Sequence, residues 1–198
     1  MELHRDDEAS KIGMWIFIFT EFLLFGGLFL VYSVYRYRNS EAFHLAAEEL
    51  NTFLGALNTI ILLISSATMA MSITAVQRKQ KKLALGLMSV TMIVALTFLV
   101  NKYFEWGYKI EHGLFPGSEK LVDFGQGEVL FYGLYFFMTG LHALHIIIGG
   151  VFIAVVMARV AKEKITHDNH VLLENAGLYW HLVDAIWIFL FPLFYLIT

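Results

Sequence analysis

The stretch FYGLYFFMTGLHALHIIIGG, residues 131–150, decides the fold class. It contains no Asp, Glu, Lys or Arg, and at 20 residues an α-helix of this sequence reaches about 30 Å, the thickness of a bilayer's hydrocarbon core. Two titratable side chains, His142 and His145, interrupt the apolar run. The stretch therefore predicts a transmembrane helix with two histidines that have a functional or structural role inside the membrane.

The same pattern recurs on both sides of this segment. The chain of 198 residues is 58% hydrophobic and only 16% charged, with a mean hydropathy of +0.65. The predicted spans are residues 13–35, 52–76, 83–107, 129–158 and 175–197. They leave no room for a soluble domain, so we expect residues 1–198 to form a single membrane domain, an all-α integral membrane bundle of five transmembrane helices. The first span is too long, and its leader MELHRDDEASK too acidic, for a secretory signal.

The distribution of cations predicts the orientation. Five spans put the two termini on opposite sides of the membrane. On the side of the N-terminus the sequence places nine cations, namely Arg5, Lys11, Arg78, Lys79, Lys81, Lys82, Arg159, Lys162 and Lys164; the other five are Arg36, Arg38, Lys102, Lys109 and Lys120. The positive-inside rule then favours a cytoplasmic N-terminus.

The composition also excludes several classes of protein. The chain has no cysteine, which excludes disulfides, thiolate-held copper and iron–sulfur clusters. Its formal net charge of −3 is too small to indicate a nucleic-acid partner.

Glu21 is the most unusual residue of the first span. It lies in GMWIFIFTEFLLFGGLFLVY, and none of its helical neighbours three or four residues away can pair with it. An ionisable group in hydrocarbon costs roughly 2.5–3.5 kcal/mol on insertion scales, so it marks either a functional group or a contact with another helix.

The last two spans each present a polar stripe. In the fourth, Tyr132, Tyr135, Thr139, His142, His145 and Gly149 recur at helical spacing on one face. The two histidines suit either hydrogen bonds between helices or metal or haem ligation. In the fifth, His181 and Asp184 stand three residues apart, and we expect them to form a charge-assisted hydrogen bond with each other.

Further polar residues lie near span ends. We expect Glu105, Trp106 and Glu128 to make interfacial or lipid contacts, and residues 41–50 to form a short amphipathic helix on the outer surface. The glycine-rich connection at residues 108–128 is expected to be irregular.

Five blocks, in order, resemble subunit III of the haem-copper oxidases. They are KIGMWIFIFTE, LNTIILLISSAT, KYFEW, FYGLYFFMTGLHALHIIIGG and YWHLVDAIWIFLFPLFY, and they cover residues 11–198. The resemblance is to the short bacterial form, which lacks the first two of the family's seven helices. It implies helices splayed into a V that holds lipid, and it places Glu21 on the family's intramembrane, proton-linked glutamate. His142, His145, His181 and Asp184 match the polar positions of the last two family helices.

The resemblance also implies a function. Subunit III of cytochrome c oxidase binds no cofactor and holds no metal; haem and copper belong to the partner subunits. It packs against catalytic subunit I in the bacterial plasma membrane, near subunit II and phospholipids, where it supports proton uptake and protects the oxygen-reducing site. The sequence favours cytochrome c as the electron donor of the complex, with a quinol oxidase or a nitric-oxide-reductase-associated relative as the alternatives.

Two functions of other classes remain open from the residues alone. A haem-bearing membrane anchor would use His142, His145 and His181 as ligands. A stand-alone proton carrier would be built around Glu21. Neither requires a catalytic residue in this chain.

Overall fold

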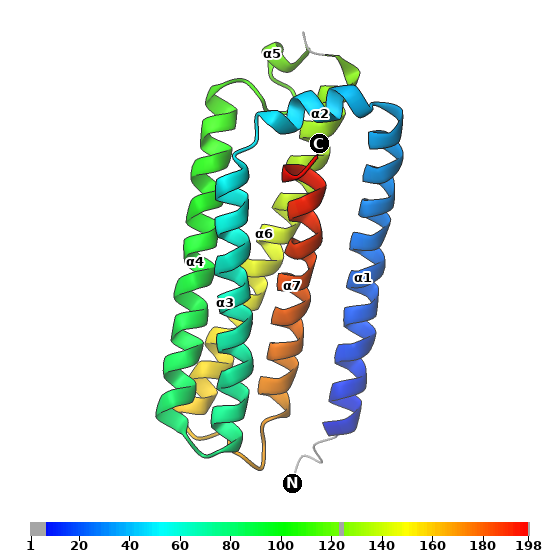
Figure 1. Ribbon diagram of the computed structural model, residues 1–198. Coiled ribbons are helices and arrows are strands. Elements are labelled where there is room, and N and C mark those ends of the chain that lie inside the picture. Colours follow the sequence, from blue (N-terminus) through cyan, green and yellow to red (C-terminus); the bar gives the residue numbers. More distant parts are fainter. Residues whose placement is uncertain (1–6, 123–124, 198) are drawn as a thin grey trace.

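The computed structural model describes residues 7–122 and 125–197, which are helical nearly throughout (Figure 1). Five helices are long and apolar enough to cross a membrane: α1 (Asp7–Arg38), α3 (Thr52–Gln77), α4 (Lys81–Glu111), α6 (Gln126–Ala161) and α7 (Val171–Tyr195). Two short helices, α2 (Ser40–Glu48) and α5 (Glu119–Val122), lie at one end of the bundle (Figure 1). The predicted all-α bundle of five spans is confirmed.

The helices extend beyond the apolar windows that predict them. Helix α4 continues to Glu111 and α6 begins at Gln126, so the irregular connection is shorter than residues 108–128. The predicted surface helix at residues 41–50 is α2. The extension of α4 matters for function, because it carries Glu105 inside the helical bundle instead of leaving it at a frayed end.

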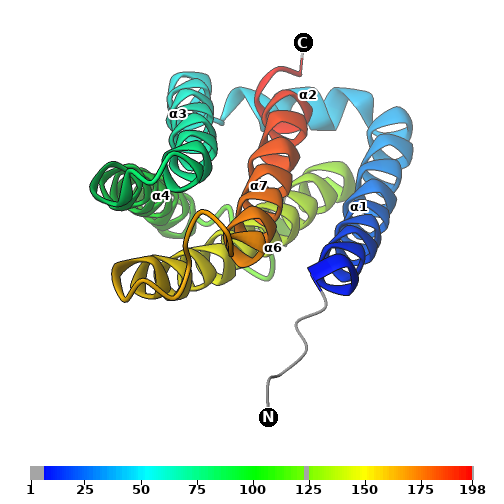
Figure 2. The ribbon, with the colours of Figure 1, turned by 90° about the horizontal axis from the view of Figure 1, so that it is seen from below.

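Helix α7 occupies the centre of the arrangement. Figure 2 shows α7 between α1 on one side and α3 on the other, with α6 beneath it. Helix α3 packs along α4, while α1 contacts only α2, α6 and α7 among the described residues. The result is a four-helix group of α3, α4, α6 and α7 with α1 attached at its flank.

Glycines allow the central helices to approach closely. A Cβ added at Gly149 of α6 would lie 2.8 Å from the Tyr179 ring and 2.9 Å from the Trp180 ring of α7. A Cβ at Gly55 of α3 would lie 2.8 Å from the ring of Tyr195. Small residues at such contacts are the usual way in which membrane helices gain van der Waals contact, since lipid provides no hydrophobic drive between helices.

Polar contacts near its two ends attach α1 to α7. At its start, Lys11 forms an ion pair with Glu174 at 2.8 Å, and the Asn175 amide donates to the Ser10 hydroxyl at 3.0 Å. At its end, the Tyr32 hydroxyl donates to the carbonyl of Leu193. Most other side chains of α1 are exposed, so this helix offers a large surface to lipid or to a partner.

The structure changes the number of surface cations on one side of the bundle. Two of the five cations at the α2 end, Lys102 and Lys109, are buried inside the bundle. Among the described residues, this leaves Arg36, Arg38 and Lys120 against eight cations on the other side. The charge bias that predicts a cytoplasmic N-terminus is therefore stronger at the surface than in the sequence count.

Candidate functional site: polar side chains inside the bundle

The polar residue of the first span has its partner on another helix. The Glu21 Oε2 of α1 lies 3.0 Å from His145 Nε2 of α6, and both side chains are largely buried. The His145 ring also makes a T-shaped contact with Phe25 and stacks on Tyr179. The position of Glu21 is thereby fixed between two apolar helices at the junction of α1 with the four-helix group.

The geometry of this pair indicates which of its atoms carry hydrogens. His145 Nδ1 lies 2.8 Å from the Leu141 carbonyl oxygen, which can only accept, so Nδ1 carries a hydrogen. The short contact between Nε2 and Glu21 then requires a second proton, either on the carboxyl or on Nε2. Whichever atom holds it, one hydrogen lies between the two side chains.

The expected hydrogen bond between His181 and Asp184 is wrong. His181 Nδ1 instead lies 2.7 Å from the Ser66 hydroxyl of α3, and both Asp184 oxygens lack a partner that meets hydrogen-bond geometry among the described residues. The Ser66 hydroxyl also interacts with Asp184. A hydroxyl supplied by a neighbouring helix therefore replaces the direct contact that spacing along α7 suggested.

His142 is enclosed by aromatic rings. Its imidazole is fully buried, stacks on Trp187 at a centroid distance of 5.3 Å, and meets the Phe98 ring edge-on at 5.6 Å. Neither ring nitrogen has a hydrogen-bond partner within the described part of the chain. The α6 stripe thus places His142 inside the four-helix group and His145 on its α1 flank.

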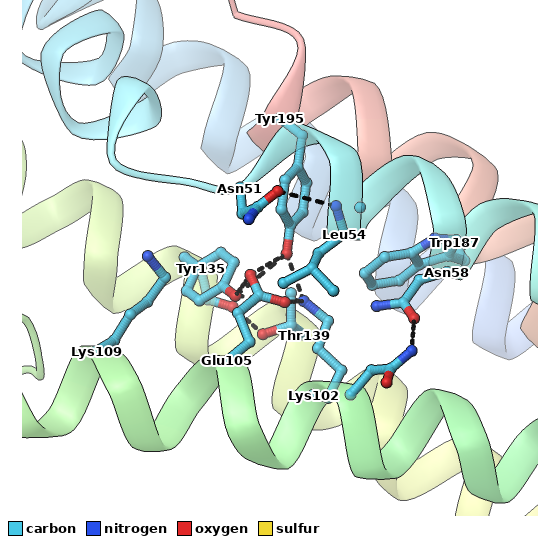
Figure 3. A network of polar contacts seen from close by, with 12 residues as sticks. Asn51, Leu54, Asn58, Lys102, Glu105, Lys109, Tyr135, Thr139, Trp187 and Tyr195 are labelled. Carbon is cyan, nitrogen blue, oxygen red and sulfur yellow. Dashed lines mark hydrogen bonds and ion pairs between the residues drawn. The ribbon is translucent and has the colours of Figure 1, made fainter.

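Sequence reasoning missed the densest polar cluster, which Figure 3 shows near the α2 end of the bundle. Lys102 Nζ lies 3.0 Å from Glu105 Oε2 and 2.5 Å from the Tyr195 hydroxyl. Glu105 Oε1 accepts hydrogen bonds from Tyr135 at 2.6 Å and Tyr195 at 2.5 Å. The Lys102 ammonium also sits over the Trp187 ring, 4.8 Å from its centroid. We call these four polar residues (Lys102, Glu105, Tyr135 and Tyr195) the lysine–glutamate cluster.

A second buried ammonium lies beside this cluster. Lys109 Nζ donates to the Glu49 carbonyl at 3.3 Å and faces the rings of Tyr132 and Tyr135. The only sequence signal for the whole arrangement is the spacing of Lys102 and Glu105 in KYFEW, which allows an ion pair on one helix. The tyrosines come from α6 and α7, and their meeting point cannot be read from a single segment.

The residues expected at interfaces occupy three different environments. Glu105 is buried in the lysine–glutamate cluster. Trp106 packs on Phe136 of α6, and its buried indole nitrogen has no partner among the described residues. Glu128 lines a polar pocket of about 350 Å³ at the α2 end, together with Glu49 and other residues.

These features define a class of protein: a multi-pass membrane subunit with several titratable groups held between its helices. Within the described residues no group of three or more His, Asp or Glu side chains is placed to hold a metal ion. The three candidate histidines have different surroundings. His145 pairs with Glu21, His181 contacts Ser66, and His142 is enclosed by aromatic rings.

Comparison with known proteins identifies the family. The family model for cytochrome c oxidase subunit III matches residues 6–198. Similar proteins include a probable quinol oxidase subunit 3 from Staphylococcus saprophyticus, 29% identical over 193 residues, and one from Staphylococcus haemolyticus, 28% identical over 193 residues. A Staphylococcus aureus protein of the same description is 27% identical over 195 residues. Each alignment covers 98% of this chain and 91% of the relative.

The chain belongs to the cytochrome c oxidase subunit III family, and is a subunit III of a haem-copper oxidase. The resemblance seen in the five sequence blocks is confirmed. Proteins of this family lack redox centres of their own. As a subunit III, the chain is a membrane subunit that associates with other oxidase subunits.

Proposed function

We propose that this chain is the accessory subunit of a proton-pumping terminal oxidase in a bacterial plasma membrane, where it supports proton delivery to catalytic subunit I. In this proposal, subunits I and II carry the haem and copper centres at which oxygen is reduced to water. The observation that carries the proposal is the Glu21–His145 pair, a carboxyl and an imidazole held 3.0 Å apart between two transmembrane helices.

The placement of this pair suits a supporting role. Both side chains retain a little exposure at the junction of α1 with α6, unlike the fully buried His142. A proton bound there can exchange when α1 shifts or when water reaches the junction, whereas the lysine–glutamate cluster has its charges compensated inside the bundle. Glu21 is therefore the residue that we assign to proton handling.

The electron donor is a second question. The sequence favoured cytochrome c, while the similar Staphylococcus proteins are named as quinol oxidase subunits. A subunit without redox centres does not itself receive electrons from either donor. The names of the relatives favour quinol as the donor of the complex that contains this chain.

Lipid contact follows from the exposure of α1. Large apolar side chains such as Ile16, Leu23 and Val34 recur at helical spacing and are exposed along one face of this helix. We propose that phospholipid covers this face, in keeping with the V-shaped lipid cleft that the family resemblance implies. The missing first two helices of the longer family form would leave such a cleft with different walls here.

Affinity purification of this subunit in mild detergent, followed by an optical spectrum and a donor assay, tests the proposal. Haem and copper that co-purify with a second membrane subunit, and oxygen uptake driven by a quinol, are the expected results. Oxygen uptake with reduced cytochrome c alone would reverse the donor assignment. A protein that purifies alone with a haem band of its own would support a membrane anchor, and proton flux through the isolated chain in liposomes would support a carrier; either would overturn the proposal.

A further inference from the structure

One polar group of the bundle faces outward and is incompletely paired. His181, Ala185 and Ile188 share one face of α7 at i, i+4 and i+7, and Ile188 is 46% exposed. His181 is partly exposed on this face. Its Nδ1 contacts Ser66, but its Nε2 has no hydrogen-bond partner among the described residues. In hydrocarbon no water is present to supply the missing bond.

The other partly exposed titratable groups inside the membrane make this one stand out. His142 and Asp184 also lack hydrogen-bond partners among the described residues, but both are buried. Glu21 is paired with His145, and Lys102 with Glu105 and two tyrosines. The His181 site is left open at the surface. A chain that satisfies its other partly exposed intramembrane groups internally leaves this one for a group from outside.

The face of α7 around His181 is flanked by α1 and α3. These two helices have no contact with each other among the described residues, and Figure 2 shows α7 between them. An apolar groove of about 170 Å³ runs between α1 and α7, lined by residues that include Gly26, Phe29, Ala185 and Phe189. A Cβ added at Gly26 would meet nothing within 4 Å. Gly26 and Ala185 are the two small residues of this otherwise bulky lining, and small residues allow another helix to approach closely.

We propose that this α7 face, comprising Ser66, His181 and Ala185 with the adjoining Gly26 groove, is the docking surface for a transmembrane helix of the partner oxidase subunit. This inference rests on the proposed function. The helix presents a hydrogen-bond donor, such as a hydroxyl or an amide, to His181 Nε2.

The direction of the hydrogen bonds around Ser66 indicates that the group facing His181 Nε2 is a donor. The Ser66 hydroxyl interacts with both His181 and Asp184, and both Asp184 oxygens otherwise lack donors. If the Ser66 hydroxyl donates to Asp184, its oxygen accepts from His181 Nδ1. The neutral imidazole then has its free lone pair on Nε2, which requires a donor from the partner. The three side chains form a short relay that ends at the docking surface.

Single-cysteine cross-linking tests the surface directly, because the natural chain has no cysteine. Ala185→Cys on the α7 face and Ile148→Cys on the exposed face of α6 are each labelled with a maleimide–benzophenone in the assembled complex and illuminated. We expect a cross-link from position 185 to a transmembrane segment of another oxidase subunit, and mainly lipid adducts from position 148. Lipid adducts alone at 185, or an equal yield of subunit adducts at 148, would overturn the proposal.

A second measurement tests the hydrogen bond. His181→Leu should weaken retention of the partner subunit in detergent by about three- to eighteen-fold, the range for one interhelical hydrogen bond in a membrane. The control Ile148→Leu, on the exposed face of α6, should leave retention unchanged. Full retention by His181→Leu would refute the assigned contact. If the wild-type chain retains no oxidase subunit at all, the proposed function fails as well, which separates the two conclusions.

Discussion

Removal of Glu105 should be among the most destabilising substitutions in this bundle. The Lys102 side chain is 2% exposed and that of Glu105 is 5% exposed, so the pair is shielded from solvent. Glu105→Ala leaves the Lys102 ammonium buried without its counter-charge and removes the acceptor of two tyrosine hydroxyls. Breaking a buried pair from one side costs about 3–5 kcal/mol, and we expect a loss of that size in the free energy of unfolding.

The paired substitution provides the control. Lys102→Met combined with Glu105→Leu removes both charges and keeps the volume similar. Such replacements of a buried ion pair are often neutral, so the double variant should recover most of the loss, short by about 1–2 kcal/mol for the two tyrosine hydroxyls left without an acceptor. Those hydroxyls, of Tyr135 and Tyr195, stand 3.3 Å apart and can partly satisfy each other.

Unfolding of the purified subunit by SDS in mixed micelles measures these differences. Helix content by circular dichroism gives the transition, and tryptophan emission gives a local signal, since Trp187 lies against the Lys102 ammonium. A cost below about 1 kcal/mol for Glu105→Ala would show that the cluster is well hydrated, contrary to its burial. A double variant that is as unstable as the two single variants added together would show that the charges do not act as a pair.

Three further substitutions give contrasting results. Glu21→Gln should keep the complex assembled, because the amide still donates to the ring beside it, but should shorten the period of steady oxygen uptake; failure to co-purify with the oxidase would contradict this. Gly149→Leu should cost about 1–3 kcal/mol through overpacking, while Gly133→Leu, where an added Cβ meets nothing within 4 Å, should be tolerated in the same SDS assay. The Lys81 ammonium donates to Glu163 and holds the pKa of that carboxyl below its usual value, so any stabilisation is present at neutral pH and is lost as the pH falls through the lowered value. Because both side chains are exposed, Lys81→Ala should leave the unfolding transition at pH 7 unchanged, and a measurable shift would contradict that reading.

The helices and their inward faces could be predicted from the sequence. The α6 stripe that includes Tyr135, Thr139 and His142 is buried along its whole length, as its helical spacing predicts. Asn58 and Ser65 of α3 are likewise fully buried. Periodicity succeeds here because each helix has one face against its neighbours, whatever those neighbours are.

The pairing of side chains between helices could not be predicted in the same way. Glu21 required a partner from elsewhere, but nothing in its own span indicates His145, which lies 124 residues away. Spacing along α7 suggested His181 with Asp184, whereas rotation of the helix against α3 brings in Ser66. Such contacts depend on helix rotation and vertical offset, which a single sequence does not encode locally.

Depletion and reconstitution of the subunit test the central claim most directly. The oxidase is purified with and without this chain, and oxygen uptake is followed through many turnovers, with the purified subunit added back to the depleted complex. We predict that the depleted oxidase begins to turn over but loses activity during catalysis, and that added wild-type subunit restores steady uptake. A depleted complex that matches the intact one in both initial rate and persistence would contradict the claim that this chain supports proton delivery in a terminal oxidase.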